Sequence, residues 1–424
     1  MVGNAVTKVQ NRSWLRERIF LGMSIGDYVK GLLTPFNLIA GVIILLGLVF
    51  LVLRFVQGLG AVTGASQDQP WGLFLSWGLF SGIPLAATGF VLGTAVYVFN
   101  LKQYHPVVRN AVLLGLLGYL FAVIFLLIDL GRPWRLPFPM VLSYGTVSAL
   151  FLVAWTVALH LTCYFLELSP SICEWGGWKT LREWMSKMSV GLAVFVMTLS
   201  TLHQSALGAL YLLAPGKLHP LWYSSYLPWL FLISAIAAGI CMVIVVSWVS
   251  KRFLKKETDA AYLASLDRIT LGLGTGAAFV LFTYFGLKLV ALAQGNNWDL
   301  LNTGYGYWFL VELFGFVLLP ALLLVFAVRR NKVGLVQLTA GMALIGVIIN
   351  RLNVSLIAIN WELAERELFN WREFLIILSI VTIEVLVYRW VVRRMPVLRA
   401  HPEFKAEEEE PELSDVTPVS TVMQ

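Results

Sequence analysis

The chain alternates between long apolar stretches and short polar segments. A helix that crosses a membrane needs roughly 20 mostly apolar residues, and ten stretches meet this requirement. They are Phe36–Gln57, Trp71–Phe99, Val108–Asp129, Val141–Leu166, Met188–Leu212, Tyr226–Val249, Ile269–Ala293, Trp308–Val328, Val333–Ser355 and Phe374–Val392. The alternating pattern of a membrane β-barrel is absent. Because a backbone in lipid must satisfy its own hydrogen bonds, the pattern predicts an all-α integral membrane protein with ten transmembrane helices.

Polar segments flank these stretches and predict the topology. Residues 1–35 are basic and lack the short apolar core and cleavage site of a signal peptide. Residues 393–424 form a Glu- and Pro-rich tail that is typical of disorder. Between them, residues 36–392 form one transmembrane domain. Most Lys and Arg residues fall on the side of the N-terminus when the ten spans alternate, which predicts that both termini are cytoplasmic.

A weak internal repeat relates the two halves of the transmembrane domain. Gly82-Ile83 in the second span recurs as Gly239-Ile240 in the sixth, and a Phe-Leu pair precedes each at the same spacing. Both spans run in the same direction. The repeat therefore predicts two parallel four-helix bundles, spans 2–5 over residues 71–212 and spans 6–9 over residues 226–355, with spans 1 and 10 outside them. Chance matching in a biased composition is the alternative.

Composition narrows the class of protein. Hydrophobic residues make up 58% of the 424 residues and charged residues 13%, whereas soluble domains carry about 25% charged residues. This excludes a soluble enzyme, a disordered chain and a nucleic-acid-binding module. The net charge of +7 fits the basic cytoplasmic loops of a membrane protein. Cys163, Cys173 and Cys241 are too few and too scattered for a disulfide framework or an iron–sulfur cluster, and no metal site is predicted.

Ionisable side chains are costly inside a bilayer, so each of them is a candidate functional residue. The spans contain Asp129, His160, His203, Lys288, Glu312, Arg351 and Glu384. Counting about 1.5 Å per residue places most of them in the outer half of the membrane. His160 is expected near the inner end of the fourth span, and Glu384 near the middle of the tenth.

The fifth span carries a polar face on an otherwise apolar helix. Its members recur at helical spacing and are Ser200, His203, Gln204, Gly208 and Tyr211. This face either lines a cavity that receives a polar head group or makes helix–helix hydrogen bonds within a bundle. We expect Asp129, at the end of the third span, to be a partner of His203. Asp129 either exchanges protons beside the basic segment Gly131–Arg135 or anchors that segment at the membrane surface.

Other polar groups also allow two interpretations. Lys288, Glu312 and Arg351 either neutralise one another in the second bundle or belong to a proton or quinone path. Trp77 and Tyr144 either pack in the interior or contact a ligand.

Bis-histidine haem ligation requires two imidazoles at one depth. His160 is expected about 30 Å below the outer surface and His203 about 13 Å below it. This separation predicts that the chain holds no haem.

Several ordered motifs are similar to the NrfD-like family of membrane subunits. They are Leu199–Gly208, Leu212–Tyr223, Asp129–Arg135 and Asn350–Val354, and the chain looks closest to the HybB-type membrane subunit of uptake hydrogenases. The resemblance covers the ten spans but not the acidic tail. It implies a haem-free subunit in the bacterial inner membrane that exchanges electrons with menaquinone or another quinone. It also implies a periplasmic ferredoxin-like iron–sulfur subunit as partner, linked to a nickel–iron hydrogenase, a molybdopterin enzyme or a multihaem cytochrome c.

The resemblance places the quinone head group in the first bundle near the outer face, which agrees with the position expected for Asp129 and His203. We expect His203 to hydrogen-bond a quinone oxygen and transfer a proton, Asp129 to orient or recharge it, and Gln204 and Tyr211 to shape the pocket. Trp77 and Tyr144 complete the predicted quinone contacts. A second hypothesis is proton conduction through His160, Glu167, Lys288, Glu312, Arg351 and Glu384.

Two other classes of function stay open. A passive membrane anchor would use the same polar groups for structure alone. A secondary transporter would need inverted repeats and broken helices, which the parallel repeat does not favour.

Overall fold

The computed structural model describes residues 16–66, 69, 71–142, 145–213, 215–363 and 366–399. Within these residues, ten helical segments are long and apolar enough to cross a membrane. They are Pro35–Gln57, Phe74–Val98, Lys102–Asp129, Phe151–Gly176, Ser189–Leu213, Leu227–Phe253, Ala260–Gly295, Gly304–Arg329, Val333–Ile357 and Trp371–Arg394. In the described part, the only β-bridge outside helices pairs Leu218 with Ile359. The prediction of an all-α membrane protein with ten spans is confirmed.

Some spans are single helices and others are composite. The largely continuous ones are α3 (Pro35–Gln57), α6 (His105–Asp129), α8 (Ala149–Gly176), α10 (Ser189–Ala209), α11 (Leu227–Phe253), α12 (Ala260–Gly295), α15 (Val333–Leu352) and α16 (Trp371–Arg394). The second span joins η2 (Phe74–Ser81), α4 (Gly82–Leu85), α5 (Thr88–Gly93) and η3 (Thr94–Val98), and the eighth joins α13 (Gly304–Leu310), η10 (Val311–Leu318) and α14 (Leu319–Arg329). Short helices outside the spans include α2 (Ile25–Leu32), α7 (Phe138–Val141) and α9 (Lys179–Lys187).

Local sequence explains where helices begin and end, as α3 illustrates. The Thr34 hydroxyl accepts a hydrogen bond from the Asn37 amide at 3.3 Å, and Pro35 occupies the first helical position. Gly58 ends the helix with φ +94°, a backbone conformation that costs little only for glycine. Pro35 and Gly58 thus delimit an apolar helix whose side chains are mostly exposed on the protein surface, as expected of a helix that faces lipid.

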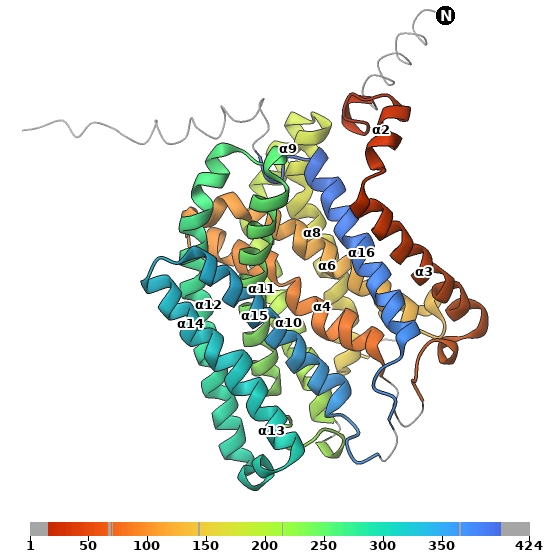
Figure 1. Ribbon diagram of the computed structural model, residues 1–424, viewed down its shortest axis with the longest axis vertical. Coiled ribbons are helices and arrows are strands. Elements are labelled where there is room, and N and C mark those ends of the chain that lie inside the picture. The colour runs from red at the N-terminus through yellow and green to blue at the C-terminus, as the bar shows by residue number, and fades with distance from the viewer. Residues whose placement is uncertain are drawn as a thin grey trace, which may run out of the picture.

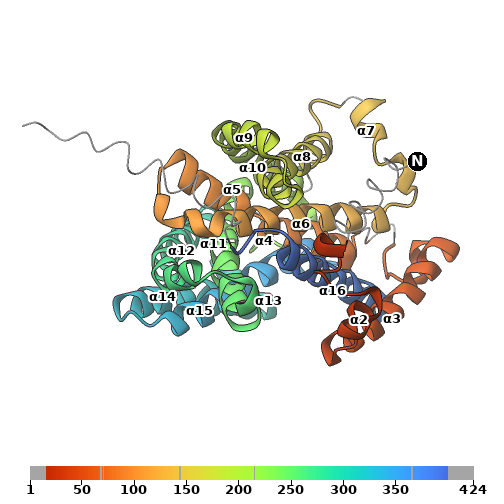
Figure 2. The same cartoon turned by 90° about the horizontal axis from the view of Figure 1, so that it is seen from above.

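For description we divide the spans by their contacts into two groups, which also pack against each other where α11 and α15 contact the second span (Figure 1, Figure 2). In the first group, the second span packs against α6, α6 against α8, and α8 against α10, which returns to α5 and η3. In the second group, α11 packs against α12 and α15, and α14 packs against the same two helices α12 and α15. Helices α10 and α11 join the groups, while α3 and α16 pair at the edge of the molecule.

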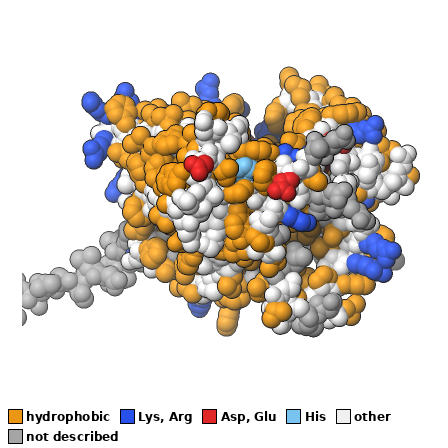
Figure 3. All heavy atoms as spheres, turned by 90° about the horizontal axis from the view of Figure 1, so that it is seen from below, with side chains coloured by type: hydrophobic (Ala, Val, Ile, Leu, Met, Phe, Trp, Pro, Cys, Tyr) orange, Lys and Arg blue, Asp and Glu red, His pale blue; other side chains and the backbone are white. Residues whose placement is uncertain are grey.

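Both ends of the described chain lie on one side of the molecule. The Arg394 guanidinium, at the end of α16, donates to the Ile19 carbonyl oxygen at 2.8 Å and to the Tyr28 hydroxyl at 2.7 Å. We call this side, which carries α2 and α9 (Figure 1), the inner side, because the Lys/Arg distribution predicts that it is cytoplasmic. The opposite, outer side is largely hydrophobic with few charged side chains (Figure 3).

The two composite spans each contain a π-helical segment in their outer part. The η2 segment of the second span is π-helical and lies just before Pro84, and η10 of the eighth span is π-helical and lies just before Pro320. A π-turn inserts an extra residue and rotates the side chains that follow it, and such turns are frequent at functional sites. Trp77 lies in the first of these segments and Glu312 in the second.

Candidate functional site

The polar face of α10 meets a histidine and a tyrosine from two neighbouring spans. Tyr119 of α6 stacks on the His160 ring of α8, with ring centroids 4.7 Å apart and planes within 6°. The Tyr119 hydroxyl lies 3.2 Å from Nδ1 of His203, and the two imidazole centroids are 6.0 Å apart. All three side chains are fully buried. The first bundle therefore contains a compact aromatic and imidazole cluster in its interior.

Hydrogen bonds determine which ring nitrogen of each imidazole carries a proton. Nδ1 of His160 lies 3.0 Å from the Thr156 carbonyl oxygen, which only accepts, and Nε2 lies 2.7 Å from the Ser200 hydroxyl. His160 is therefore satisfied on both sides. When the Tyr119 hydroxyl donates to Nδ1 of His203, Nε2 of His203 carries the proton. This Nε2 is buried without a hydrogen-bond partner among the described residues, so it is free to donate to a ligand.

Two more polar groups on this face of the fifth span lack partners. The Gln204 amide donates weakly to the Ile83 carbonyl at 3.5 Å, but its Oε1 is buried without a partner among the described residues. The Tyr211 hydroxyl is also buried without a hydrogen-bond partner among the described residues, and the Tyr211 ring packs on Phe80 with centroids 5.4 Å apart. A buried polar atom without a partner costs about 1–3 kcal/mol. Three such atoms on one face indicate that a ligand or water completes the site.

The structure corrects the expected depth of His160. Helix α8 begins at Ala149, whereas the apolar pattern placed the start of the span at Val141. The eight residues of difference correspond to about 12 Å. His160 therefore lies level with His203, not near the inner end of its span, and the depth argument against a bis-histidine haem was wrong. The error arose because the segment from α7 to the start of α8 is also apolar in sequence, so the hydropathy pattern included it in the fourth span.

Asp129 lies apart from His203. Ten residues of α6 separate Asp129 from Tyr119, a rise of about 15 Å, so the expected direct contact between Asp129 and His203 is not formed. Asp129 instead interacts with Arg54 of α3 and with Glu373 of α16. Arg54 donates to the Ile128 and Leu130 carbonyl oxygens at 2.5 and 2.6 Å. These contacts place Asp129 in an outer rim cluster.

This rim cluster also fixes the start of the second span. The Glu373 carboxylate accepts a hydrogen bond from the Phe74 amide at 2.7 Å. The negative charge of Glu373 thus lies at a helix N-terminus, where it stabilises the helix. Arg54 and Glu373 are 3% and 2% exposed. Neither residue stands out in the sequence. Arg54 lies near the end of the first predicted span, and Glu373 precedes the predicted last span by one position.

Trp77 lies in a different place from the His203 cluster. It lines an apolar groove of about 280 Å³ together with residues of α6, α11 and α16, including Gly118, Met242 and Glu384. Gln204 reaches the backbone of the second span at Ile83, and the groove does not include His203, Gln204 or Tyr211. The structure thus does not place Trp77 with the expected quinone contacts. Tyr144 lies outside the described residues.

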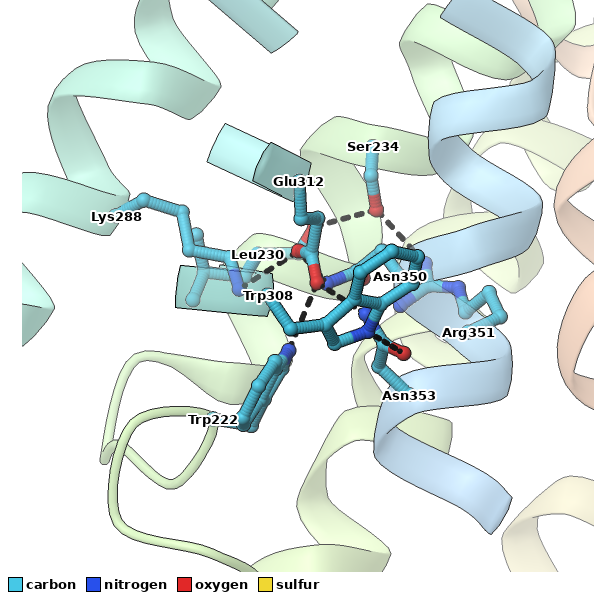
Figure 4. Close-up of polar contacts among 9 residues, drawn as sticks. All are labelled: Trp222, Leu230, Ser234, Lys288, Trp308, Glu312, Asn350, Arg351 and Asn353. Atoms are coloured by element: carbon cyan, nitrogen blue, oxygen red, sulfur yellow. Dashed lines mark hydrogen bonds and ion pairs between the residues drawn. The ribbon is translucent and has the colours of Figure 1, made fainter. Parts of the chain in front are cut away.

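Glu312 forms the centre of a polar cluster in the second group of helices (Figure 4). Its carboxylate accepts hydrogen bonds from four side chains of three other segments. The donors are Asn350 at 2.7 Å, Asn353 at 2.5 Å, Trp222 at 2.8 Å and Lys288 at 3.4 Å. Lys288 and Glu312 therefore neutralise each other. The two oxygens of the Glu312 carboxylate also accept hydrogen bonds from the three neutral donors. This geometry favours the structural interpretation of the pair.

Arg351 has other partners. It donates to the Phe231 carbonyl oxygen at 2.9 Å and to the Ser234 hydroxyl at 2.8 Å, and its Cζ lies 3.5 Å above the Phe231 ring centroid. Among the described residues, its Nε and Nη1 have no hydrogen-bond partner. Arg351 interacts electrostatically with Tyr211, so it faces the polar side of α10 from across the junction between the two groups.

Glu167 lies on the same face of α8 as His160, seven residues further toward the inner side. Tyr164 lies between them, and its hydroxyl accepts from the Phe90 amide at 3.1 Å. Oε2 of Glu167 is buried without a partner among the described residues. The residues expected on one proton path therefore occupy four places: His160 beside His203, Glu167 below it, the Glu312 cluster with Arg351, and Glu384 in the groove.

The loop between α10 and α11 explains why Leu212–Tyr223 forms a motif. The His219 amide donates to the Ala358 carbonyl oxygen at 2.9 Å, and the His219 ring packs on Tyr305 and Trp361 with centroids 4.6 and 4.8 Å apart. Burial lowers the pKa of His219. Trp222, three residues later, donates to Glu312. This loop therefore links the outer surface to the Glu312 cluster.

The chemistry of the α10 face suits a small carbonyl compound. The unpartnered Nε2 of His203 can donate a hydrogen bond to a carbonyl oxygen, and the Gln204 and Tyr211 oxygens can accept one from a hydroxyl. Trp71, Phe80 and Phe231 surround the Tyr211 ring, with centroids 5.4 to 5.8 Å away, and supply aromatic walls. In the described part of the chain, no group of three or more His, Cys, Asp or Glu residues is arranged to hold a metal ion.

Comparison with known proteins shows the family to which the chain belongs. The family model for polysulphide reductase, NrfD, matches residues 61–360. A protein of Nitratidesulfovibrio vulgaris (strain Hildenborough) is 44% identical over 378 residues, which cover 89% of this chain and 97% of the relative.

Two further relatives have informative names. The probable Ni/Fe-hydrogenase 2 b-type cytochrome subunit of Escherichia coli (strain K12) is 32% identical, over 85% of this chain and 92% of the relative. The menaquinone reductase integral membrane subunit of N. vulgaris is 27% identical, over 82% of this chain and 87% of the relative. With the family model covering most of the spans, the chain belongs to the family of polysulphide reductase, NrfD.

Proposed function

We propose that this chain is the quinone-interacting membrane subunit of a respiratory oxidoreductase complex in the inner membrane of a bacterium. In this role it exchanges electrons between a periplasmic iron–sulfur subunit and menaquinone. The observation that carries the proposal is a set of buried polar atoms on one face of the fifth span that have no partner among the described residues, namely His203 Nε2, Gln204 Oε1 and the Tyr211 hydroxyl. The relatives named as menaquinone reductase and hydrogenase subunits support the substrate class and the setting.

The quinone ring would take the place between the α10 face and the second span. His203 donates a hydrogen bond to one carbonyl oxygen and transfers a proton to it as the ring receives electrons. Tyr119 and His160 hold the His203 ring in place, and Ser200 fixes His160. His160 thus acts as a positioning residue here. Because these side chains are fully buried, entry of the ring requires α10 and the second span to separate locally.

Protons would reach or leave this site from the outer rim. Asp129 and Arg54 lie at the outer end of α6, about 15 Å from the level of Tyr119, so water would have to bridge them to His203. Electrons would come from a partner subunit, as the names of the relatives as subunits of a hydrogenase and of a menaquinone reductase suggest. The exposed side chains of Trp134, Val141 and Leu142, next to Arg132 and Arg135, offer a contact surface for the iron–sulfur subunit on the same side.

Binding of a quinone analogue to the purified complex tests the proposal. The quinoline N-oxide inhibitor HQNO is titrated by fluorescence quenching into wild type, His203→Leu and a control variant, Thr201→Val. Thr201 is exposed on the same helix, and its hydroxyl donates to the Met197 carbonyl oxygen one turn earlier. We expect His203→Leu to weaken binding at least tenfold and to stop quinone reduction, while Thr201→Val matches wild type.

Two results would contradict the proposal. His203→Leu that assembles with its partner subunits and reduces quinone at the wild-type rate removes the assignment of His203. Failure of the wild-type complex to bind HQNO at all favours the alternative of a passive membrane anchor. Substrate uptake into vesicles without quinone turnover would instead indicate a transporter.

A further inference from the structure

Helix α2, on the inner side of the molecule, exposes an apolar face. The apolar residues on this face recur with helical spacing and are 42–66% exposed, namely Ile25, Val29, Leu32 and the adjacent Leu33. Asp27 and Lys30 lie on the other side of the helix, and none of the residues of α2 is buried. A helix with one apolar and one polar face is typical of a helix that lies in the plane of a membrane surface.

Hydrogen bonds hold α2 against the inner ends of two spans. The side-chain amide of Asn37, in the first turn of α3, donates to the Leu32 carbonyl oxygen at 2.8 Å. The Arg394 guanidinium, at the end of α16, donates to the Tyr28 hydroxyl at 2.7 Å. The Phe20 ring packs edge-on against the Tyr28 ring, with centroids 5.4 Å apart. These contacts fix the position of α2, so its apolar face is a defined surface of the molecule.

The apolar face of α2 is continuous with the lipid-facing surface of α3. Helix α2 lies directly beyond the inner end of α3 (Figure 1), and two residues separate its last residue from Pro35. In the first two turns of α3, Phe36, Ile39 and Val42 are 47%, 63% and 59% exposed. Because the bilayer covers this side of α3, lipid is the material next to α2. The bilayer surface is therefore better placed than a soluble protein to cover the apolar face.

A guanidinium group with unused donors lies at the same place. Arg389, near the inner end of α16, is partly exposed, and its Cζ lies 4.4 Å above the Phe36 ring. Its only hydrogen bond to the described residues runs to Oδ1 of Asn37 at 3.3 Å, although a guanidinium has five N–H donors. The nearby Glu257 carboxylate pairs with Arg393 instead, at 3.3 Å. Arg389 is therefore a cation that can accept an anionic partner at the membrane surface.

From these contacts we propose that α2 lies in the headgroup region of the inner leaflet with its apolar face toward the acyl chains, and that Arg389 binds the phosphate of an anionic phospholipid beside it. The phosphate oxygens accept hydrogen bonds from the N–H groups of Arg389 that the protein leaves unused. Lys30, Arg393 and Arg394 make the surroundings basic, which favours a lipid with a net negative charge. Asn37 binds both Arg389 and the end of α2, so the lipid and the helix share one support. The proposal does not depend on quinone binding.

The depth of α2 is measured with a fluorophore on one introduced cysteine, because Cys163, Cys173 and Cys241 are all buried. A bimane label is attached to Val29→Cys or, as the matched control on the other side of the helix, to Asp27→Cys. The purified complex is reconstituted in vesicles of phosphatidylethanolamine and phosphatidylglycerol. We expect a lipid with a doxyl group close to its headgroup to quench the label of Val29→Cys, and aqueous iodide to quench that of Asp27→Cys. The complex without an introduced cysteine should take up no label.

Native mass spectrometry tests the lipid at Arg389. The purified complex is titrated with phosphatidylglycerol or phosphatidylcholine, and we expect wild type to prefer phosphatidylglycerol. Arg389→Gln should bind phosphatidylglycerol about fivefold more weakly, which is the effect of one basic residue near an anionic headgroup, and Arg389→Lys should recover part of the affinity. Arg252→Gln is the matched control, since it removes one positive charge from the last turn of α11, and it should match wild type.

Three outcomes would overturn the proposal. Equal quenching of the two labels by iodide would show that water covers the apolar face of α2. A label on Val29→Cys that neither iodide nor the doxyl lipid quenches would show that a protein covers it. Unchanged binding of phosphatidylglycerol to Arg389→Gln would remove the lipid from Arg389. None of these outcomes involves quinone, so failure of this proposal is distinct from failure of the quinone assignment at His203.

Discussion

The Lys288–Glu312 pair allows a quantitative test of whether the second group of helices is structural. Lys288 and Glu312 are 5% and 2% exposed, and their charged atoms are 3.4 Å apart. Lys288→Met removes the only cation within 4 Å of the Glu312 carboxylate among the described residues and leaves three neutral donors. Glu312→Gln leaves the Lys288 ammonium buried without its counter-charge. The double variant Lys288→Met/Glu312→Gln removes both charges.

The expected magnitudes follow from the cost of a buried, unpaired charge. Removing one partner of a buried ion pair costs about 3–5 kcal/mol. In the double variant, the oxygen of the new side-chain amide at position 312 can accept some of the hydrogen bonds that the carboxylate accepted, and neither position 288 nor position 312 carries an unpaired charge. The double variant should therefore be less destabilised than either single variant. We expect a coupling energy of about 2–3 kcal/mol. For a chain of this size, the single variants should lower the melting temperature by about 3–6 °C.

The assay is thermal unfolding in detergent, followed by tryptophan fluorescence, with the membrane potential generated during quinone turnover in liposomes as a second measurement. We expect the potential per turnover of the double variant to equal that of wild type. A double variant whose destabilisation equals the sum of the two single effects would refute the pairing. A collapsed potential with normal turnover would instead place the pair on a proton path.

Three further predictions test other contacts. Because hydrogen bonds occupy both nitrogens of His160 and Nδ1 of His203, the chain purified without other subunits should give no pyridine haemochrome spectrum, and one haem b per chain would refute this. Arg54→Met should destabilise the fold by about 1–3 kcal/mol because it leaves the Ile128 and Leu130 carbonyl oxygens at the end of α6 without their donors, whereas Arg54→Lys should recover part of the melting temperature. Gly208→Val should cost about 1–3 kcal/mol because a Cβ at Gly208 would lie 2.5 Å from the Leu227 carbonyl oxygen. Gly191→Ala, with nothing within 4 Å, should not change the melting temperature.

The sequence was sufficient to predict the ten spans, because hydrophobic length is a direct requirement of the bilayer. It was less reliable at the ends of spans. The fourth span was placed eight residues too early because α7 and the loop after it are also apolar, and this shift moved His160 by about 12 Å. Boundaries of this kind depend on where a loop folds back over the protein, which hydropathy does not report.

The candidate site was predicted in part. The polar face of α10 was visible from its helical spacing, and the structure buries it as expected. Tyr119 was not foreseen, since one tyrosine in an apolar span gives no signal. The partner of Asp129 was also missed, because Arg54 appeared in the sequence only as the basic end of a peripheral helix. Contacts between distant spans depend on packing that one sequence does not reveal.

Helix α6 connects the polar sites that the other helices keep apart. Asn110 accepts a hydrogen bond from Tyr388 of α16, Gly118 lines the groove with Glu384, and Tyr119 contacts His203. Gly118 and Tyr119 are neighbours in sequence but face different sides of the helix. A Cβ on Gly118 would overlap Ala86 of the second span, so α6 and that span are in close contact at this level. If a ring that enters beside His203 moves the second span, the wall of the Glu384 groove moves with it. Mechanical coupling between the two sites would then need no continuous chain of hydrogen-bonded groups from His203 to Glu384.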